Sequence, residues 1–335
     1  MQIHFVTGRK SFARWRDIDA LAADEVDRLP QRFRSGVDVW IAQTYLRLRE
    51  PLRAAGIEAR FGDRFLPGAL CIAHRDDLNK FTSGAQRAFV VAVRADRPPV
   101  CIGERVIVQN NVSPDTQRRR FLPLWPQPGL LPRDPHRGDR LERMAYFGRE
   151  GALPLWFREP RFIDALAQCG VRFEIRHEAW HDYRDVDLVL AYRLESPSML
   201  RVKPATKLAN AWLAGVPALL GDEPAYRALR QSELDYVPIA SAGDAINAVR
   251  VLKSDASRYR AMVENGSRRG REFSVDATKE RWLDFLLKDA IPAHAAWQAE
   301  NASIVGSLAA IVRFQSGMAA QKLAARFFRR GLAFE

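Results

Sequence analysis

Short runs of apolar residues alternate with helical patterns along the first two-fifths of the chain. The runs that predict strands cover residues 3–6, 69–73, 88–93 and 105–108. Runs this short and this continuously apolar are typical of strands buried on both faces, as in a parallel sheet. An apolar segment also begins at residues 37–41, and a helical pattern runs from Thr44 to Ala55 and ends at Gly56.

A second series of the same kind begins at residue 143. Its predicted strands cover residues 143–147, 171–175, 186–191, 217–220 and 237–239. Its predicted helices cover residues 159–168, 206–214, 224–230, 244–253 and 255–271. Two successive strand–helix series with right-handed crossovers predict an α/β protein with two Rossmann-like domains.

The segment between the two series differs in composition. Residues 123–140 are rich in Pro, Gly and charge, so they cannot continue a helix and are interpreted as a linker. Helical patterns over 276–288, 292–312 and 314–331 close the chain. We therefore expect an N-terminal domain over 1–135, a second domain over 141–275 and C-terminal helices over 276–335.

The charge of the chain favours anionic partners. Lys and Arg number 52 against 40 Asp and Glu, a formal net charge of +12. Two basic clusters stand out, residues 118–120 and Arg326 with 329–330. No nucleic-acid-binding motif is legible, so nucleic acid is an unlikely partner. There is no long apolar run and no signal peptide pattern, and three dispersed cysteines favour reduced thiols in a cytoplasmic protein.

The stretch RVKPATKLANAWLAGVPALLGDEPAYRAL, residues 201–229, has the most specific pattern. It predicts a helix that opens with Lys203, Pro204 and Lys207 and ends at Gly215. The lysines are four apart, on one face, and lie at the positive end of the helix dipole, where free backbone amides favour a diphosphate. The alternative is a solvated pair of lysines on an exposed helix face.

This stretch, KPxxKxxNAxxAGVPxL followed by an acidic loop, resembles the donor-binding half of GT-B glycosyltransferases. Residues 145–149 and 183–191 resemble other parts of that half. The resemblance implies two Rossmann-like domains facing across a cleft, a nucleotide sugar held mainly by the second, and C-terminal helices that return to the first.

The resemblance also implies roles for individual residues. Arg149, Lys203 and Lys207 would neutralise the diphosphate in place of a metal, so no metal or cofactor is expected. Asn210 and Ser198 would donate hydrogen bonds to phosphate or ribose, and Glu223 would accept from hydroxyls. Many retaining members carry two glutamates separated by seven residues in this region. Here Lys203 stands at that distance after Glu195, so inversion and retention both stay open.

The N-terminal domain would supply any catalytic base. His74 and Asp76 directly follow the predicted strand 69–73, whose carboxyl end faces the cleft in this fold. The alternative is that Asp76 or Asp77 caps the next helix.

The function predicted from these patterns is transfer of a sugar from a nucleotide sugar to a glycan, lipid-linked or other hydroxyl acceptor, as in polysaccharide biosynthesis. The alternatives are a non-catalytic anion- or nucleotide-binding module, and a GT-B-like epimerase or phosphorylase. The basic amphipathic helix over 314–331 is expected to pack on the first domain, with peripheral contact to the inner face of the membrane as the alternative.

Overall fold

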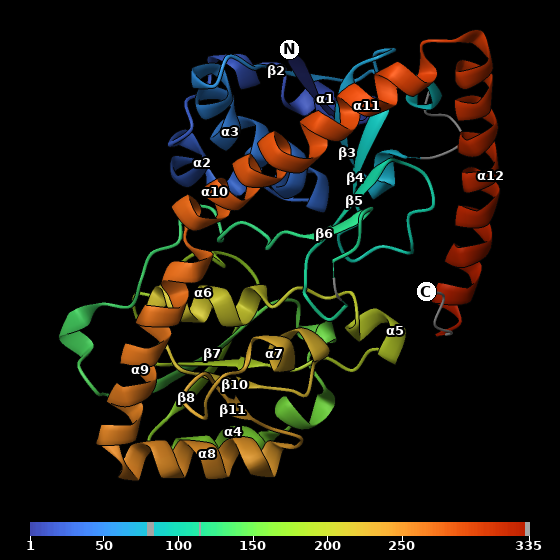
Figure 1. Ribbon diagram of the computed structural model, residues 1–335. Coiled ribbons are helices and arrows are strands. Elements are labelled where there is room, and N and C mark those ends of the chain that lie inside the picture. The colour runs from blue at the N-terminus through green and yellow to red at the C-terminus, as the bar shows by residue number, and fades with distance from the viewer. Residues whose placement is uncertain (79–83, 114, 332–335) are drawn as a thin grey trace. The chain divides into compact units, whose positions relative to one another are not determined.

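The computed structural model describes residues 1–78, 84–113 and 115–331 (Figure 1). They form two compact units. Unit 1 takes in Met1–Trp125, Pro197–Pro204 and the chain from Thr278 on, and unit 2 takes in Pro126–Ser196 and Ala205–Ala277. Both are α/β units built on a parallel sheet, which confirms the predicted fold class.

The sheet of unit 1 has the strand order β2-β1-β3-β4-β5-β6 and is parallel throughout. Its strands are β1 (Gln2–Val6), β2 (Glu58–Gly62), β3 (Leu70–His74), β4 (Phe89–Val93), β5 (Arg105–Val108) and β6 (Arg119–Phe121). Every residue of β3 and β4 is buried, as the continuous apolar runs predicted. The edge strands β2 and β6 were not predicted, because each carries charged residues and leaves part of its surface in solvent.

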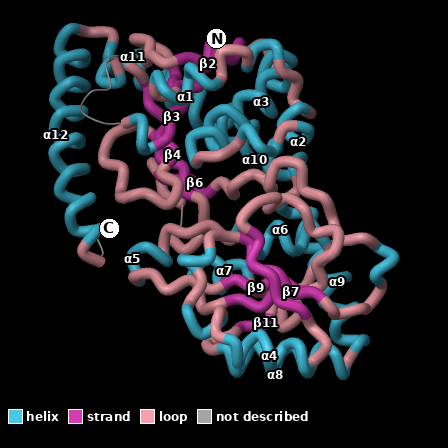
Figure 2. The backbone as a smooth tube through the Cα atoms, turned by 180° about the vertical axis from the view of Figure 1, so that it is seen from behind, coloured by secondary structure: helices cyan, strands magenta, loops and turns pink. Residues whose placement is uncertain are grey.

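Helices cover both faces of this sheet. They are α1 (Arg9–Arg14), α2 (Glu25–Arg28), α3 (Gln43–Ala54), α5 (Pro197–Leu200), α10 (Val275–Phe285, which begins in unit 2), α11 (Ile291–Asn301) and α12 (Ile304–Arg329). Figures 1 and 2 show α12 on one side of the sheet and α3 on the other. The apolar segment at 37–41 leads into a π-helical turn, Asp38–Ala42, that continues as α3.

The breaks between the C-terminal helices differ from the prediction. The π-helical turn Leu286–Ala290 joins α10 to α11 where a break was expected, and α12 runs through residue 313 without one. The helix expected over 292–312 ends at Asn301, and α12 begins at Ile304. The break falls here because the Ser303 side chain accepts a hydrogen bond from the Gly306 amide at 3.0 Å, as an N-cap residue does.

The sheet of unit 2 has the order β11-β10-β9-β7-β8 and is also parallel. Its strands are β7 (Arg143–Phe147), β8 (Arg172–Arg176), β9 (Leu188–Ala191), β10 (Ala218–Leu220) and β11 (Val237–Pro238). Its helices are α4 (Pro160–Gln168), α6 (Thr206–Ala214), α7 (Pro224–Leu229), α8 (Ala242–Ser254) and α9 (Ala256–Gly270).

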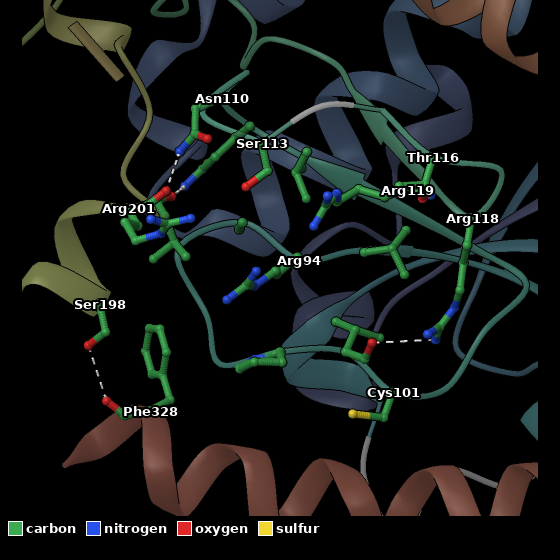
Figure 3. Close-up of a pocket in the computed structure, with 17 residues that line it drawn as sticks. Arg94, Cys101, Asn110, Ser113, Thr116, Arg118, Arg119, Ser198, Arg201 and Phe328 are labelled. Atoms are coloured by element: carbon green, nitrogen blue, oxygen red, sulfur yellow. Dashed lines mark hydrogen bonds between the residues drawn. The ribbon is translucent and has the colours of Figure 1, made fainter. Parts of the chain in front are cut away.

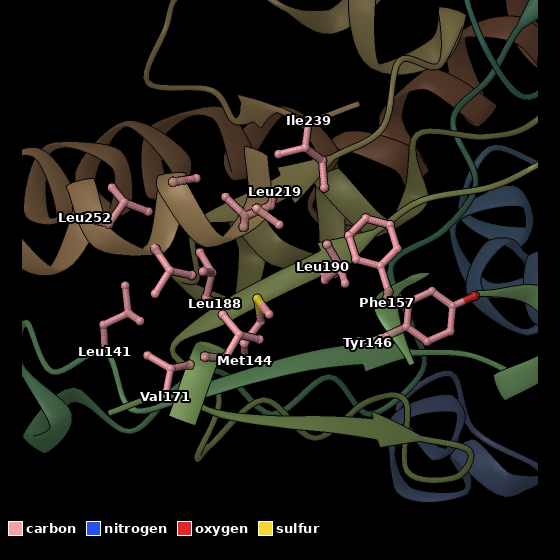
Figure 4. Packing of buried hydrophobic residues seen from close by; sticks show 14 of the residues in the cluster. Leu141, Met144, Tyr146, Phe157, Val171, Leu188, Leu190, Leu219, Ile239 and Leu252 are labelled. Atoms are coloured by element: carbon pink, nitrogen blue, oxygen red, sulfur yellow. The ribbon is translucent and has the colours of Figure 1, made fainter. Parts of the chain in front are cut away.

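Alternate residues of the central strands β7, β9 and β10 enter different cores. Met144, Tyr146, Leu188 and Leu190 pack with α4, α8 and α9 in the core shown in Figure 4. Their neighbours along the same strands, including Val189, pack with α6 and α7 on the other face. Because side chains alternate between the faces of a strand, this double burial requires the continuous apolar runs seen in the sequence.

The expected linker is part of unit 2 from Pro126 on, so the first domain ends before residue 135. Leu131 forms a parallel bridge with Asp182, and the Arg133 amide donates to the Ala214 carbonyl at 2.9 Å. The guanidinium groups of Arg133 and Arg137 both bind the fully buried Asp187. Proline and glycine rule out a regular helix here, but they do not prevent the segment from packing.

Candidate functional site

Three neighbouring strands of unit 2 end in segments that carry polar side chains. Gly148 and Arg149 follow β7, Tyr192 and Arg193 follow β9, and residues 221–223 follow β10. Since β10, β9 and β7 are adjacent and parallel, these segments leave the same edge of the sheet. This carboxyl edge is where α/β proteins of this type bind their ligands.

A buried ion pair lies at this edge. Arg193 Nη1 donates to Glu223 Oε2, and lies 3.5 Å from the Tyr226 hydroxyl. Glu223 is 1% exposed, and its second oxygen, Oε1, has no hydrogen-bond partner among the described residues. Burial raises the pKa of Glu223, and attraction to Arg193 offsets part of that rise. Burial lowers the pKa of Arg193, but attraction to Tyr226 and Glu223 outweighs it and the pKa rises.

Two glycines let aromatic rings lie against these strand ends. A Cβ on Gly148 would come within 2.9 Å of the Tyr146 ring, and one on Gly221 within 2.9 Å of the Tyr192 ring. Any larger residue would displace a ring. The Nζ of Lys207 lies 4.1 Å from the centroid of the Tyr146 ring, which places the lysine at the same edge through a cation–π contact.

The first turn of α6 is suited to an anion. Its N-cap residue is Ala205, which makes no side-chain cap, so the first-turn amides have no such acceptor. Thr206 Oγ1 is buried and has no hydrogen-bond partner among the described residues. Amides, a hydroxyl and the positive helix end therefore lie together with Lys207.

The predicted position of Lys203 in this helix is wrong. α6 begins at Thr206, so Lys203 and Pro204 precede the helix and belong to unit 1. The Nζ of Lys203 pairs with Asp96 of the same unit at 3.2 Å. The prediction placed Pro204 in the first turn because a helix accepts proline there. That acceptance does not determine where the helix begins.

The other predicted binding residues are divided between the units. Arg149 is exposed directly after β7, at the edge that holds Lys207 and Glu223. Asn210 lies on α6, where its Oδ1 accepts from the Gln127 amide at 3.2 Å. Ser198 belongs to unit 1, and its hydroxyl donates to the Phe328 carbonyl at 3.4 Å. Sequence reasoning missed Arg193 and Thr206; the position of Arg193 just after the predicted strand 186–191 was the available signal.

His74, Asp76 and Asp77 lie at the end of β3 and directly after it in unit 1. His74 is 1% exposed and caps the short 3-10 turn Arg75–Asp77, because its Nδ1 accepts from the Asp76 amide at 3.2 Å. The histidine caps this turn, and the alternative that Asp76 or Asp77 caps the next helix falls on residues 79–83, outside the described part of the chain. Asp76 is bound by Arg97 Nε through both oxygens, at 2.8 and 2.9 Å.

These contacts give the three groups different proton affinities. Burial lowers the pKa of His74 to about 4, so the imidazole is neutral near pH 7. Burial alone would raise the pKa of Asp76, but the Arg97 hydrogen bonds hold it below its usual value. Burial raises the pKa of Asp77 to about 6, despite a hydrogen bond from the Gly8 amide at the end of β1. Asp77 is therefore the carboxylate best matched to proton transfer near neutral pH.

The C-terminal helix has one packed and one exposed part. Met318, Gln321, Ala324 and Phe328 are buried, as expected for the packed interpretation of 314–331. Most of the exposed large apolar side chains are earlier, at Ile304, Val305, Leu308 and Val312, and Leu323 is exposed within the later part. Among described residues, no single helix is long and apolar enough to cross a membrane; one bent pair, Ala256–Asn301 with Ile304–Arg329, qualifies by length and composition alone. Peripheral membrane contact stays a prediction.

Solved structures share this architecture at low sequence identity. Sucrose-phosphate synthase from Thermosynechococcus elongatus aligns with a TM-score of 0.56 and 12% identity, over 88% of this chain and 100% of its own. Anabaena HepE in complex with UDP aligns with a TM-score of 0.51 and 13% identity, over 86% of this chain and 99% of its own. HepE in complex with UDP-glucose aligns with a TM-score of 0.50 and 12% identity, over 86% and 100%.

Neither the known family models nor the curated proteins gave a match to this chain. The likeness to solved structures identifies the fold as the two-unit α/β architecture of GT-B proteins, which confirms the expected fold class.

Proposed function

We propose that this chain transfers a sugar from a nucleotide-diphosphate sugar to a hydroxyl acceptor, with the donor bound at the carboxyl edge of the unit 2 sheet. The observation that carries the proposal is the buried Glu223, whose Oε1 is unpartnered among described residues, beside the cationic first turn of α6. The fold supports it, since HepE shares the fold and its structures hold UDP and UDP-glucose.

Different residues of the site bind the diphosphate and the hydroxyl groups of the donor. Lys207, Arg149 and the first-turn amides of α6 neutralise the diphosphate, which leaves when the bond from its oxygen to the anomeric carbon breaks. Glu223 accepts hydrogen bonds from ribose or sugar hydroxyls through Oε1, and Arg193 holds that carboxylate in place through Oε2. Asn210 supports α6 against the segment at Gln127.

The acceptor oxygen forms the new bond to the anomeric carbon and must lose a proton. We propose that Asp77 of unit 1, which lies near the carboxyl ends of β1 and β3, is the base that accepts this proton. It replaces His74 and Asp76, the candidate bases from the sequence. The diphosphate charge is balanced by side chains and amides, so the proposal needs no metal ion.

The experiment is calorimetric titration with UDP, GDP, ADP and their glucose conjugates, with and without a chelator. We expect saturable binding of one of these nucleotides. Lys207→Ala should lower the affinity for that nucleotide at least tenfold, about 1.4 kcal/mol. The matched control is Arg250→Ala, which removes an exposed cation from α8. A ligand at a hundred times its dissociation constant should also stabilise the fold by about 2.7 kcal/mol.

Each result separates one alternative. Absence of binding by every nucleotide, or equal affinity of Lys207→Ala and the parent chain, would contradict the donor site. Binding without turnover of any sugar acceptor would favour a binding module. Product analysis distinguishes a transferase from an epimerase or phosphorylase, and loss of activity in the chelator would contradict metal independence.

A further inference from the structure

A cavity of about 390 Å³ lies within unit 1, apart from the residues assigned to the donor (Figure 3). Its walls come from the segments after β4 and β5, from the approach to β6, from residues 198–202 and from the end of α12. The volume is in the range of a small-molecule site and can hold a monosaccharide with one substituent.

The charge on its walls is of one sign. Four arginines line the cavity, Arg94, Arg118, Arg119 and Arg201, and no acidic side chain is among the lining residues that the structure describes. Figure 3 shows Arg94, Arg119 and Arg201 directed toward the same space from three separate segments. Arg118 instead turns to the carbonyl groups of Gly103 and Val100.

Arg94 has no acidic partner among the described residues. Its Nε donates to the Arg97 carbonyl at 3.0 Å, and its terminal nitrogens make no hydrogen bond to a described residue. The guanidinium carbon lies 6.0 Å from the centroid of the Phe328 ring. Burial, and then repulsion from Arg119, lower the pKa of Arg94 to about 10, so it remains charged near pH 7 in a site that disfavours its charge.

The wall opposite α12 is fixed by hydrogen bonds to the main chain. Asn110 Nδ2 donates to the carbonyls of Arg201 and Lys203 at 2.8 and 2.9 Å, and Gln109 Nε2 donates to Val202 at 2.8 Å. Gln109 and Asn110 follow β5 directly, so the arginine-bearing segment is tied to the sheet. A site held in this way binds without first having to order its backbone.

We propose that this cavity binds the phosphate group of a phosphorylated acceptor. Guanidinium groups match phosphate oxygens in geometry, and convergent arginines without a carboxylate among the described lining residues suit a dianion better than a monoanion. The inference rests on the proposed glycosyl transfer, because it names the class of acceptor. The sugar hydroxyl of that acceptor receives the glycosyl group, and its phosphate is unchanged by the reaction.

The test is titration of the full chain, saturated with the nucleotide that binds best, with glucose 6-phosphate, glucose and glucuronate. We expect glucose 6-phosphate to bind at least tenfold more tightly than either of the others. Arg94→Gln should lose at least tenfold in that affinity with nucleotide affinity unchanged, and Arg94→Lys should fall between the two. The control, Arg60→Gln, removes a half-exposed arginine from β2, at the opposite edge of the sheet from β6.

The outcomes distinguish a sugar phosphate from a lipid phosphate, and they distinguish failure of the phosphate site from failure of the donor site. Binding to vesicles containing phosphatidic acid that depends on Arg94, and exceeds that of free glucose 6-phosphate, places the phosphate on a lipid. Equal affinities for the three sugars, or an unchanged affinity in a folded Arg94→Gln variant, overturn the phosphate site even if the nucleotide binds. Failure of nucleotide binding alone counts against the donor site, because the phosphate titration can be run without it.

Discussion

At the residue scale, neighbouring carboxylates differ in their response to pH. The pKa of Asp77 is raised from 3.8 to about 6, so folding favours its protonated form. The contribution of protonated Asp77 to the free energy of unfolding is fully present below the unfolded pKa and is lost as the pH rises through about 6. Asp77→Asn should therefore flatten the pH dependence of urea unfolding between pH 4 and 7, by at most about 3 kcal/mol. If Asp77 is the base, transfer should fall about 10²- to 10⁴-fold.

Asp76→Asn is the matched control, because the sign is opposite. The pKa of Asp76 is lowered, so its contribution is present above the unfolded pKa and is lost as the pH falls through the folded value. Its ion pair with Arg97 is partly exposed, so the variant should lose under about 1 kcal/mol at neutral pH. If the free energy of unfolding of Asp77→Asn varied with pH as in the parent chain, the raised pKa of Asp77 would be refuted.

At the scale of elements, apolar pattern was informative where both faces of a strand are buried. β3, β4, β7 and β9 were predicted within one or two residues, because every position in these strands is apolar or nearly so. β2 and β6 were missed because edge strands carry charge on a solvated face. The contacts of residues 126–140 also escaped prediction, because arginines that bind a buried carboxylate look like surface charge in a sequence.

The anchoring of that segment gives a prediction of its own. Asp187 accepts from Arg133 and Arg137, at 2.7 to 3.0 Å, and from the amides of Glu142 and Arg143. Asp187→Asn removes the buried negative charge that the guanidinium groups of Arg133 and Arg137 share, and leaves them one amide oxygen as acceptor. Because breaking a buried ion pair is costly, it should destabilise unit 2 by about 3–5 kcal/mol, measured as a shift of the urea midpoint.

The comparison variant is Asp182→Asn, which weakens an ion pair with the largely exposed Arg184. It should cost no more than about 1 kcal/mol. A loss in Asp187→Asn as small as that of Asp182→Asn would show that residues 126–140 are held by their backbone bonds alone.

At the scale of the whole molecule, apolar pattern alone does not show which segments fold together. The resemblance implied that the C-terminal helices return to the first domain, but nothing in the sequence indicated that residues 197–204 join them. Unit 1 is completed by residues 197–204 and by the chain from Thr278 on, far from its first 125 residues in sequence. The contacts responsible, such as Gln109 to the Val202 carbonyl, join side chains that carry no local pattern. The site residues were divided for the same reason: Lys203 and Lys207 look like one helix face, yet they belong to different units.

This division predicts that shortened chains behave differently. Trp282, on α10, is fully buried with its ring centroid 6.4 Å from that of Trp40, and Met318 of α12 enters the core between β3 and β5. Residues 1–125 alone lack both and should show no cooperative urea transition by circular dichroism. Residues 126–277 keep both cores of unit 2 and the carboxyl edge of its sheet, so they should unfold cooperatively and bind the nucleotide within about tenfold of the full chain, 1.4 kcal/mol. Cooperative unfolding of residues 1–125 would show that the C-terminal helices are dispensable for unit 1. A folded 126–277 fragment with no nucleotide affinity would show that unit 2 is insufficient for the donor.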